Sequence, residues 1–215
     1  MLVSEIATRV RRQFGDEAGV EITDADIIRW VNDAQREIAV KNNLLQVRAT
    51  AGAVNGQAEY SIPSNLVTLH TVLYQNRKLQ PLSIQEANDL IGAETPVGIP
   101  THYWQFAGVI TLYPAPEVSD PDDIKLLYTR TAVEITALDQ TPEVPVTYHN
   151  RIVEYVMAQA AELDENMNRY QLKMGEFNTG MLELKDGPEW EKDVYPSITA
   201  GAADLSYYDS SHYID

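Results

Sequence analysis

Residues 144–185, VPVTYHNRIVEYVMAQAAELDENMNRYQLKMGEFNTGMLELK, carry the longest helical pattern in the chain. Their apolar side chains recur at alternating intervals of three and four residues, which places them on one face of an α-helix. The positions on this face are Val153, Val156, Ala160, Leu163, Met167, Tyr170, Met174, Phe177, Met181 and Leu184. An apolar face of this length must be covered by other helices of the chain or by further copies of it.

The residues at the ends and in the middle of this segment bear on whether it forms one helix or two. Pro142 and Pro145 prevent an earlier start, and Thr147 or Asn150 is placed to cap the first turn. A single helix would be roughly 45–50 Å long, at about 1.5 Å per residue. The alternative is a pair of antiparallel helices that meet at residues 164–166, Asp-Glu-Asn, although neither Gly nor Pro marks a turn there.

The totals of the sequence exclude several classes of protein. Its 215 residues fit one domain, or one domain with a large insertion. The absence of Cys excludes disulfides, thiolate metal sites and cysteine nucleophiles. No apolar run approaches the roughly 20 residues of a membrane span, and the N-terminus lacks the basic segment of a secretory signal. We therefore expect an intracellular origin and no membrane association.

Charge is the most informative of these totals. Lys and Arg number 16 against 32 Asp and Glu, which gives a formal net charge of −16. Proteins bind phosphates through cationic side chains, so this excess of acidic residues disfavours a protein that binds nucleic acid. It suits a surface past which DNA moves without adhering. Acidity that only keeps the protein soluble is the equal alternative.

Residues 1–45 predict a helical hairpin. A short amphipathic helix covers residues 1–14 and ends at Gly15. Its basic side chains, expected on a solvated or subunit-contacting face, are Arg9, Arg11 and Arg12. A second helix opens at Thr23, where Thr-Asp-Ala-Asp resembles a capping box. Its apolar stripe includes Trp30, which we expect in the core rather than in a ligand site.

Residues 46–142 change to a pattern of strands and turns. The expected strands cover residues 60–63, 67–74, 79–82, 103–106, 109–113 and 124–131. Turns are expected at residues 75–78 and at Ala107-Gly108, and residues 83–91 predict a short helix capped by Ser83. The pattern predicts a small antiparallel sheet or barrel inserted between two helical regions.

Residues 187–215 form a distinct C-terminal tail of small, acidic and aromatic residues with no helical or alternating period. Its spaced aromatic side chains favour a segment that orders on a partner, and a frayed terminus is the alternative. We therefore predict an α+β fold. A helical bundle is built from residues 1–45 and 143–186, with a β-rich insertion at residues 46–142 and an extended tail.

The residues that carry chemistry are dispersed along the chain. The histidines, His70, His102, His149 and His212, have no metal-ligand spacing. There is no phosphate-binding loop, nucleophile elbow or dinucleotide fingerprint. We predict no catalytic residue, no metal and no cofactor, and we retain a hydrolase built on an unrecognised carboxylate pair as a weaker alternative.

The order of these parts and their local sequence resemble the head-to-tail adaptor (connector) proteins of tailed bacteriophages. The resemblance spans residues 23–185 and rests on packing and turn patterns. Its motifs are TDADIIRWVNDAQREI at 23–38, ITLYPAP at 110–116, IKLLY at 124–128, HNRIVEY at 149–155 and AAELD at 160–164. It implies a dodecameric ring around the DNA channel, with a helical wall and a β-rich projection. Family members often divide the last helical region, which favours a helical hairpin near residues 164–168.

The resemblance also implies partners and the residues that meet them. The expected partners are further copies of the chain, the portal protein and a tail or nozzle protein, with DNA passing through unbound in the neck of a virion assembled in the host cytoplasm. The candidates for portal docking are Tyr195, Tyr207, Tyr208, Tyr213 and Ile214. Those for subunit packing are Ile6, Val10, Trp30, Tyr155 and Tyr170. Those for the channel lining are Glu162, Asp164 and Glu165.

Two other functions stay open at this point. A neck stopper or tail-completion protein would contact tail proteins instead of the portal. A carbohydrate- or ligand-binding module would use Tyr103, Trp104 and Tyr113 of the β-rich insertion as a stacking platform.

Overall fold

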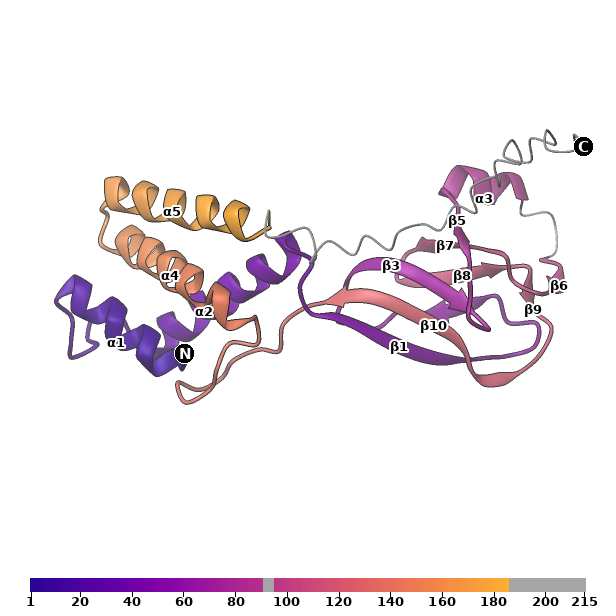
Figure 1. Cartoon of the computed structure of the whole chain (residues 1–215), viewed down its shortest axis with the longest axis horizontal. Coiled ribbons are helices and arrows are strands. Elements are labelled where there is room, and N and C mark those ends of the chain that lie inside the picture. The colour runs from indigo at the N-terminus through magenta and orange to yellow at the C-terminus, as the bar shows by residue number, and fades with distance from the viewer. Residues whose placement is uncertain (91–94, 186–215) are drawn as a thin grey trace, which may run out of the picture.

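A computed structural model describes residues 1–90 and 95–185. Helices gather at one end of the molecule and strands at the other, as Figure 1 shows. Each part has its own apolar core, and the described residues form five α-helices and several sheets. The predicted mixed α+β class is confirmed.

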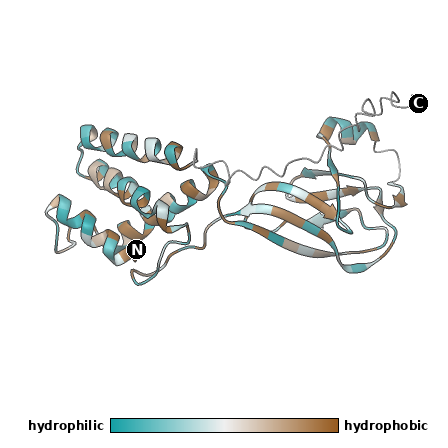
Figure 2. Cartoon of the chain, in the orientation of Figure 1, coloured by the Kyte–Doolittle hydropathy of each residue, from teal (hydrophilic) through white to brown (hydrophobic). Residues whose placement is uncertain are grey.

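Four helices make the helical part: α1 (Val3–Phe14), α2 (Asp24–Lys41), α4 (His149–Leu163) and α5 (Met167–Lys185). A 3-10 turn, Val146–Tyr148, precedes α4. The helix α4 is central because it contacts α1, α2 and α5. In Figure 2 each of these helices carries both hydrophilic and hydrophobic residues, as expected when one side of a helix is buried.

The helical pattern of residues 144–185 is therefore two helices and not one long helix. The chain reverses because Glu165 adopts the left-handed conformation, with φ of 53°, in a position that glycine usually takes. The Asn166 N–H donates to the Ala161 carbonyl at 2.8 Å, and the Asn166 side chain accepts the Arg169 N–H at 3.1 Å. Asn166 thus ends one helix and caps the next, which confirms the predicted hairpin.

The predicted caps have mixed outcomes. At α2 the capping box is confirmed, since Thr23 Oγ1 accepts the Asp26 N–H and the Asp26 carboxylate accepts the Thr23 N–H. The predicted cap of α4 by Thr147 or Asn150 is wrong, because Tyr148 occupies the N-cap position and its side chain makes no capping hydrogen bond. The preceding 3-10 turn delivers the chain into α4 instead.

The β-rich part contains short strands in three sheets. They are β1 (Gln46–Ala53), β2 (Glu59–Ser61), β3 (Leu66–Tyr74), β4 (Arg77–Lys78), β5 (Gln80–Pro81), β6 (Val97–Gly98), β7 (His102–Phe106), β8 (Val109–Tyr113), β9 (Ala115–Pro116) and β10 (Asp120–Arg130). The strand orders are β1-β10-β3-β4, β2-β8-β7-β5 and β6-β9. Most pairs are antiparallel, whereas β5–β7 and β6–β9 are parallel.

The turn at Ala107-Gly108 and the short helix are confirmed, whereas the turn expected at residues 75–78 is limited to Gln75-Asn76, because Arg77–Lys78 form β4. Two-residue turns at Gln75-Asn76 and Ala107-Gly108 have positive φ at both positions, as tight hairpins require. The helix α3 (Ile84–Leu90) is capped by reciprocal hydrogen bonds between Ser83 and Glu86. The sequence pattern missed β1, whose QVRATAGA sequence has weak strand propensity, because its pairing with β10 decides the conformation.

Residues 131–143 belong physically to the helical core, although the sequence pattern groups them with the strands. Ile135 is buried in that core and Leu138 packs against it. The buried Asn32 amide of α2 donates to the Ile135 carbonyl and accepts the Ile135 N–H, both at 2.8 Å. Gln35 Nε2 donates to the Val133 carbonyl at 2.9 Å. These hydrogen bonds hold the segment that follows β10 against α2.

Asn32→Ala should lower the free energy of unfolding by about 2–3 kcal/mol, because both backbone groups of Ile135 lose their partner in a buried place. Urea unfolding followed by circular dichroism measures the change. Arg36→Ala, on the exposed side of the same helix, is the control and should change stability by no more than about 0.5 kcal/mol. Equal effects of the two substitutions would contradict the fastening role of Asn32.

His149 is a buried histidine at the start of α4. Its Nε2 donates to the Val144 carbonyl at 3.0 Å, and its Nδ1 lies 3.1 Å from the amino group of Met1, which donates to it. Burial lowers the pKa of His149, and the nearby amino-terminal charge acts in the same direction. The fold therefore holds a neutral imidazole.

Stability should fall on mild acidification for this reason. The unfolded chain takes up the His149 proton near the ordinary pKa of about 6.5, while the folded chain resists it until a lower pH. The contribution is thus present above about pH 6.5 and is lost as the pH falls below it. Urea unfolding between about pH 7.5 and 5.5 measures this slope. His149→Asn should flatten it.

Candidate assembly surfaces

The three carboxylates expected in a channel lining lie at the turn between α4 and α5. Glu162, Asp164 and Glu165 are all exposed. Figure 1 places this turn at the end of the helical part that is farthest from the strands. The turn conformation described above holds them together at one tip of the molecule. They form an acidic tip, and its role as a channel lining stays a prediction.

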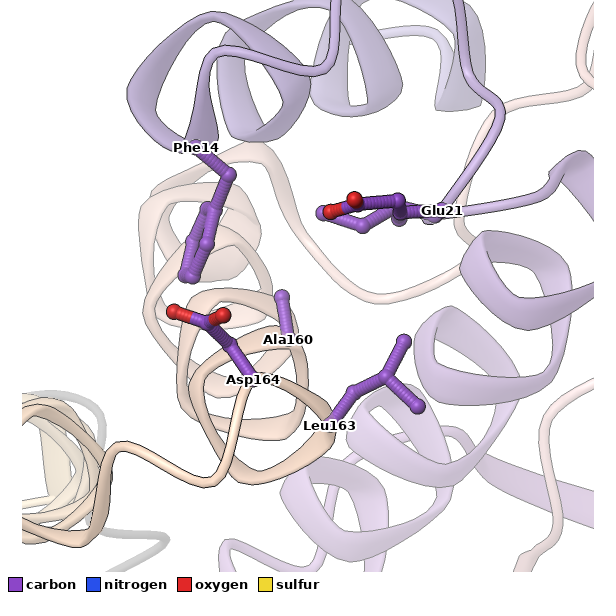
Figure 3. A pocket seen from close by; sticks show the side chains of 6 residues that line it. Phe14, Glu21, Ala160, Leu163 and Asp164 are labelled. Carbon is purple, nitrogen blue, oxygen red and sulfur yellow. The ribbon is translucent and has the colours of Figure 1, made fainter.

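A hollow of about 400 Å³ lies beside this acidic tip. Its lining residues are Phe14, Glu21, Ile22, Ala160, Leu163 and Asp164. Figure 3 shows the carboxylates of Glu21 and Asp164 facing the hollow from the loop before α2 and from the end of α4. The hollow therefore combines an apolar floor with an acidic rim, a surface suited to an apolar or cationic side chain.

The Phe14 ring is also in contact with a cation. The Arg169 guanidinium lies 3.9 Å from the centre of the Phe14 ring, and its Nη2 donates to the Gln13 carbonyl at 3.2 Å. Cation–π contacts of this kind contribute about 0.5–1 kcal/mol at exposed sites. They tie the start of α5 to the end of α1, and so stabilise the side of the molecule that carries the hollow.

The loop between α1 and α2 is organised by residues that the sequence pattern did not single out. The Asp16 carboxylate accepts three backbone N–H groups, from Val20, Glu21 and Ile22, at 2.7–3.0 Å. These hydrogen bonds, led by that of Ile22, hold the pKa of Asp16 below its ordinary value. An aspartate directly after the glycine that ends a helix is the signal that could have indicated this role.

The basic cluster of α1 divides in the structure. Arg11 turns toward its own chain, where it donates to the Ile22 carbonyl and pairs with Asp24 at 2.7 Å. Arg9 and Arg12 stay exposed. The expectation of one solvated or subunit-contacting basic face therefore does not hold for Arg11.

A polar groove lies between α1, α4 and α5. Arg151 pairs with Glu154 at 2.8 Å, and Lys173 pairs with Glu176 at 2.6 Å. Burial raises the pKa of Glu154, while the Arg151 charge opposes the rise. The Arg151 side chain also lies directly over Gly180 of α5, where a Cβ atom would overlap it. Glycine at this position therefore lets the arginine cross the helix.

The five subunit-packing candidates are not equivalent in the structure. Ile6 and Val10 have no exposed surface, and Trp30 is 5% exposed, so all three are core residues of a single copy. Tyr155 and Tyr170 are half-buried. The Tyr155 ring meets Phe177 edge-on, with 5.2 Å between ring centres. Burial, reinforced by nearby acidic side chains, raises the pKa of Tyr155 to about 12.

The stacking platform proposed for a carbohydrate- or ligand-binding module is wrong. Tyr103 and Trp104 are each only 8% exposed, and Tyr103 belongs to the core of the β-rich part. Tyr113 is half-buried and its hydroxyl donates to the Leu90 carbonyl at 3.3 Å. Tyr103 and Trp104 are consecutive in β7 and so point to opposite faces of the sheet, which means that the three rings form no single flat aromatic surface for a ligand.

The portal-docking candidates lie outside the residues that the structure describes. They are Tyr195, Tyr207, Tyr208, Tyr213 and Ile214. Within residues 1–90 and 95–185, no group of three or more His, Asp or Glu side chains is placed to hold a metal ion. None of the helices in the same ranges has the length and apolar character needed to cross a bilayer.

Comparison with known proteins places this assembly of parts in a family. No curated protein matches the chain. A family model described as SU10 adaptor protein matches residues 1–208, and so covers almost the entire sequence. This agrees with the resemblance carried by the helical hairpin, the β-rich insertion and the returning helices. The chain belongs to the SU10 adaptor protein family, a structural family of phage adaptors.

Proposed function

We propose that this chain is a head-to-tail adaptor of a tailed phage virion. Copies of it form a ring that docks on the portal and joins the capsid to the tail around the DNA channel. A ring of twelve copies follows from the family resemblance. The match of the SU10 adaptor model to residues 1–208 is the single observation that carries this proposal.

The shape of the molecule supports a connecting role. The helical and β-rich parts lie at opposite ends of the long axis of the chain in Figure 1, and each has its own core. One part can therefore pack in the wall of a ring while the other reaches a neighbouring component. The Asn32 and Gln35 contacts with residues 133–143 make the junction between the parts a defined one.

The charge of the chain supports a channel through which DNA slides. Each copy carries a formal charge of −16, and the acidic tip exposes Glu162, Asp164 and Glu165 together. Carboxylates repel phosphates, so DNA gains no stable contact with such a lining. We infer that the acidic tip faces the channel.

The tail residues supply the proposed attachment to the portal. Aromatic side chains bury a large area for little loss of conformational entropy, and a ring repeats the same contact at every copy. Weak binding by each tail then adds up to firm attachment of the ring. A neck stopper or tail-completion protein of the same machine is the second candidate, and it would bind tail proteins instead of the portal.

Deletion of residues 201–215 should abolish co-sedimentation with purified portal, because four of the five proposed docking side chains are removed. The double substitution Tyr207→Ser and Tyr208→Ser should weaken it at least about tenfold, the equivalent of about 1.4 kcal/mol. Ser206→Ala and Ser210→Ala in the same segment serve as controls and should bind like the wild type.

Portal binding that survives the deletion would rule out docking by the tail. If the full chain binds tail proteins and not the portal, the neck-stopper function replaces the adaptor function.

Neutralising the acidic tip should slow the passage of DNA. The triple substitution Glu162→Gln, Asp164→Asn and Glu165→Gln removes the proposed repulsion while leaving side-chain size nearly unchanged. In virions that carry it, the rate of DNA ejection in vitro should fall. The control removes the same number of charges from exposed sites of the β-rich part, at Glu59, Asp89 and Glu117. Equal rates in the two variants would contradict a channel position for the acidic tip.

A further inference from the structure

The helix α5 covers α4 with one side and exposes apolar side chains on the other. Phe177 and Met181 are buried against the helical core. On the outward side Leu172 is 60% exposed and Leu182 is 63% exposed. The outward side of α5 therefore leaves large apolar groups without a partner among residues 1–90 and 95–185.

The exposed positions of this outward face also lack charge, and the partly buried Lys173 and Glu176 at its edge pair with each other. Its exposed positions between residues 168 and 182 are Asn168, Gln171, Leu172, Gly175, Asn178, Thr179 and Leu182. None of them is ionised, although charged residues make up 22% of the chain. The surface of α2 differs, since it carries ion pairs such as Arg36–Asp33 and Lys41–Glu37. Depletion of charge around exposed apolar groups is typical of the centre of a protein–protein interface.

Gly175 lies in the middle of the outward face of α5. A Cβ atom placed there would meet nothing within 4 Å, and the backbone does not have a positive φ. Neither packing against the part of the chain that the structure describes nor backbone conformation therefore requires glycine, which destabilises a helix interior relative to alanine. Close approach of another polypeptide is the remaining physical use for a missing side chain.

We propose that the outward face of α5, residues 168–182, is a contact surface for a second copy of this chain, with Gly175 at the point of closest approach. This inference rests on the proposed ring, for which it names one subunit surface. The face is about 20 Å long at about 1.5 Å per residue, enough for a neighbouring element to lie along it.

Charge identifies the occupant as a second copy. Two copies that each carry −16 repel wherever their carboxylates approach, so they can meet at short range only through surfaces without carboxylates. The outward face of α5 is such a surface. A cationic partner would gain nothing from it and would be drawn to the acidic tip instead.

Gly175→Ala tests the contact, because folding and assembly should respond in opposite directions. In the full-length chain the added methyl should raise Tm by about 2–4 °C, since alanine favours the helix. It should weaken self-association at least about tenfold in sedimentation velocity over a concentration series, because the closest approach is obstructed. Leu172→Glu should weaken association further. Val118→Glu, which adds the same charge at a half-exposed valine of the β-rich part, should associate like the wild type.

The absence of cysteine in the chain allows a direct second measurement. Thr179→Cys labelled with a benzophenone maleimide should crosslink two copies on irradiation of the assembled protein. The same label on Val118→Cys should give far fewer crosslinked dimers.

The outcomes separate this inference from the proposed function. If the wild type assembles and Gly175→Ala and Leu172→Glu assemble equally well, the α5 contact is refuted and the ring is not. If Gly175→Ala lowers Tm, the single chain needs the glycine and the inference is also refuted. If the wild type stays monomeric both alone and on the portal, the ring and the contact fail together.

Discussion

The structure depends on the enclosure of α4. This helix contacts α1, α2 and α5, and its buried residues include Ile152, Val153, Val156, Met157 and Ala160. Apolar surface removed from water contributes about 25 cal/mol per Å², so a helix covered from several sides is a large source of stability. The segments that cover it come from both ends of the described chain. The inserted strands are thus held between two regions that cannot separate without exposing the core.

Polar contacts then fix how the inserted part leaves the bundle. Asn32 and Gln35 lie on the buried side of α2 and bind the backbone of residues 133–143, while Arg130 pairs with Glu143 across the base of the same loop. That hydrogen bond from Arg130 holds the pKa of Glu143 below its ordinary value. Buried amides that satisfy backbone groups specify one arrangement, because any shift leaves polar groups unpaired. A connector needs such a junction, since it must hold two neighbours at a set distance.

The surface of the molecule is divided by charge in a way that suits assembly without chemistry. Carboxylates gather at the acidic tip, and none of the exposed positions of α5 between residues 168 and 182 is a carboxylate. The acidic tip would prevent the phosphates of DNA from binding, and the uncharged face would allow two negatively charged copies to make contact. The acidic tip and the uncharged face both lie on the hairpin of α4 and α5, so the turn at Glu165 sets how the two surfaces are placed relative to each other.

Local signals were enough to predict the helices, most strands and the α+β class from sequence alone. These signals are the amphipathic periods, the capping box at Thr23 and the turn at Ala107-Gly108. The alternating apolar face of residues 144–185 did not decide between one helix and two, since the turn depends on a left-handed conformation at Glu165 that residues other than glycine rarely adopt. The sequence could not distinguish core residues from interface residues. Ile6, Val10 and Trp30 lie inside one copy. The outward face of α5 could be identified only from the structure, in which α4 covers the other side of that helix. Burial depends on which segments meet, and that information is carried by contacts between residues far apart in the chain.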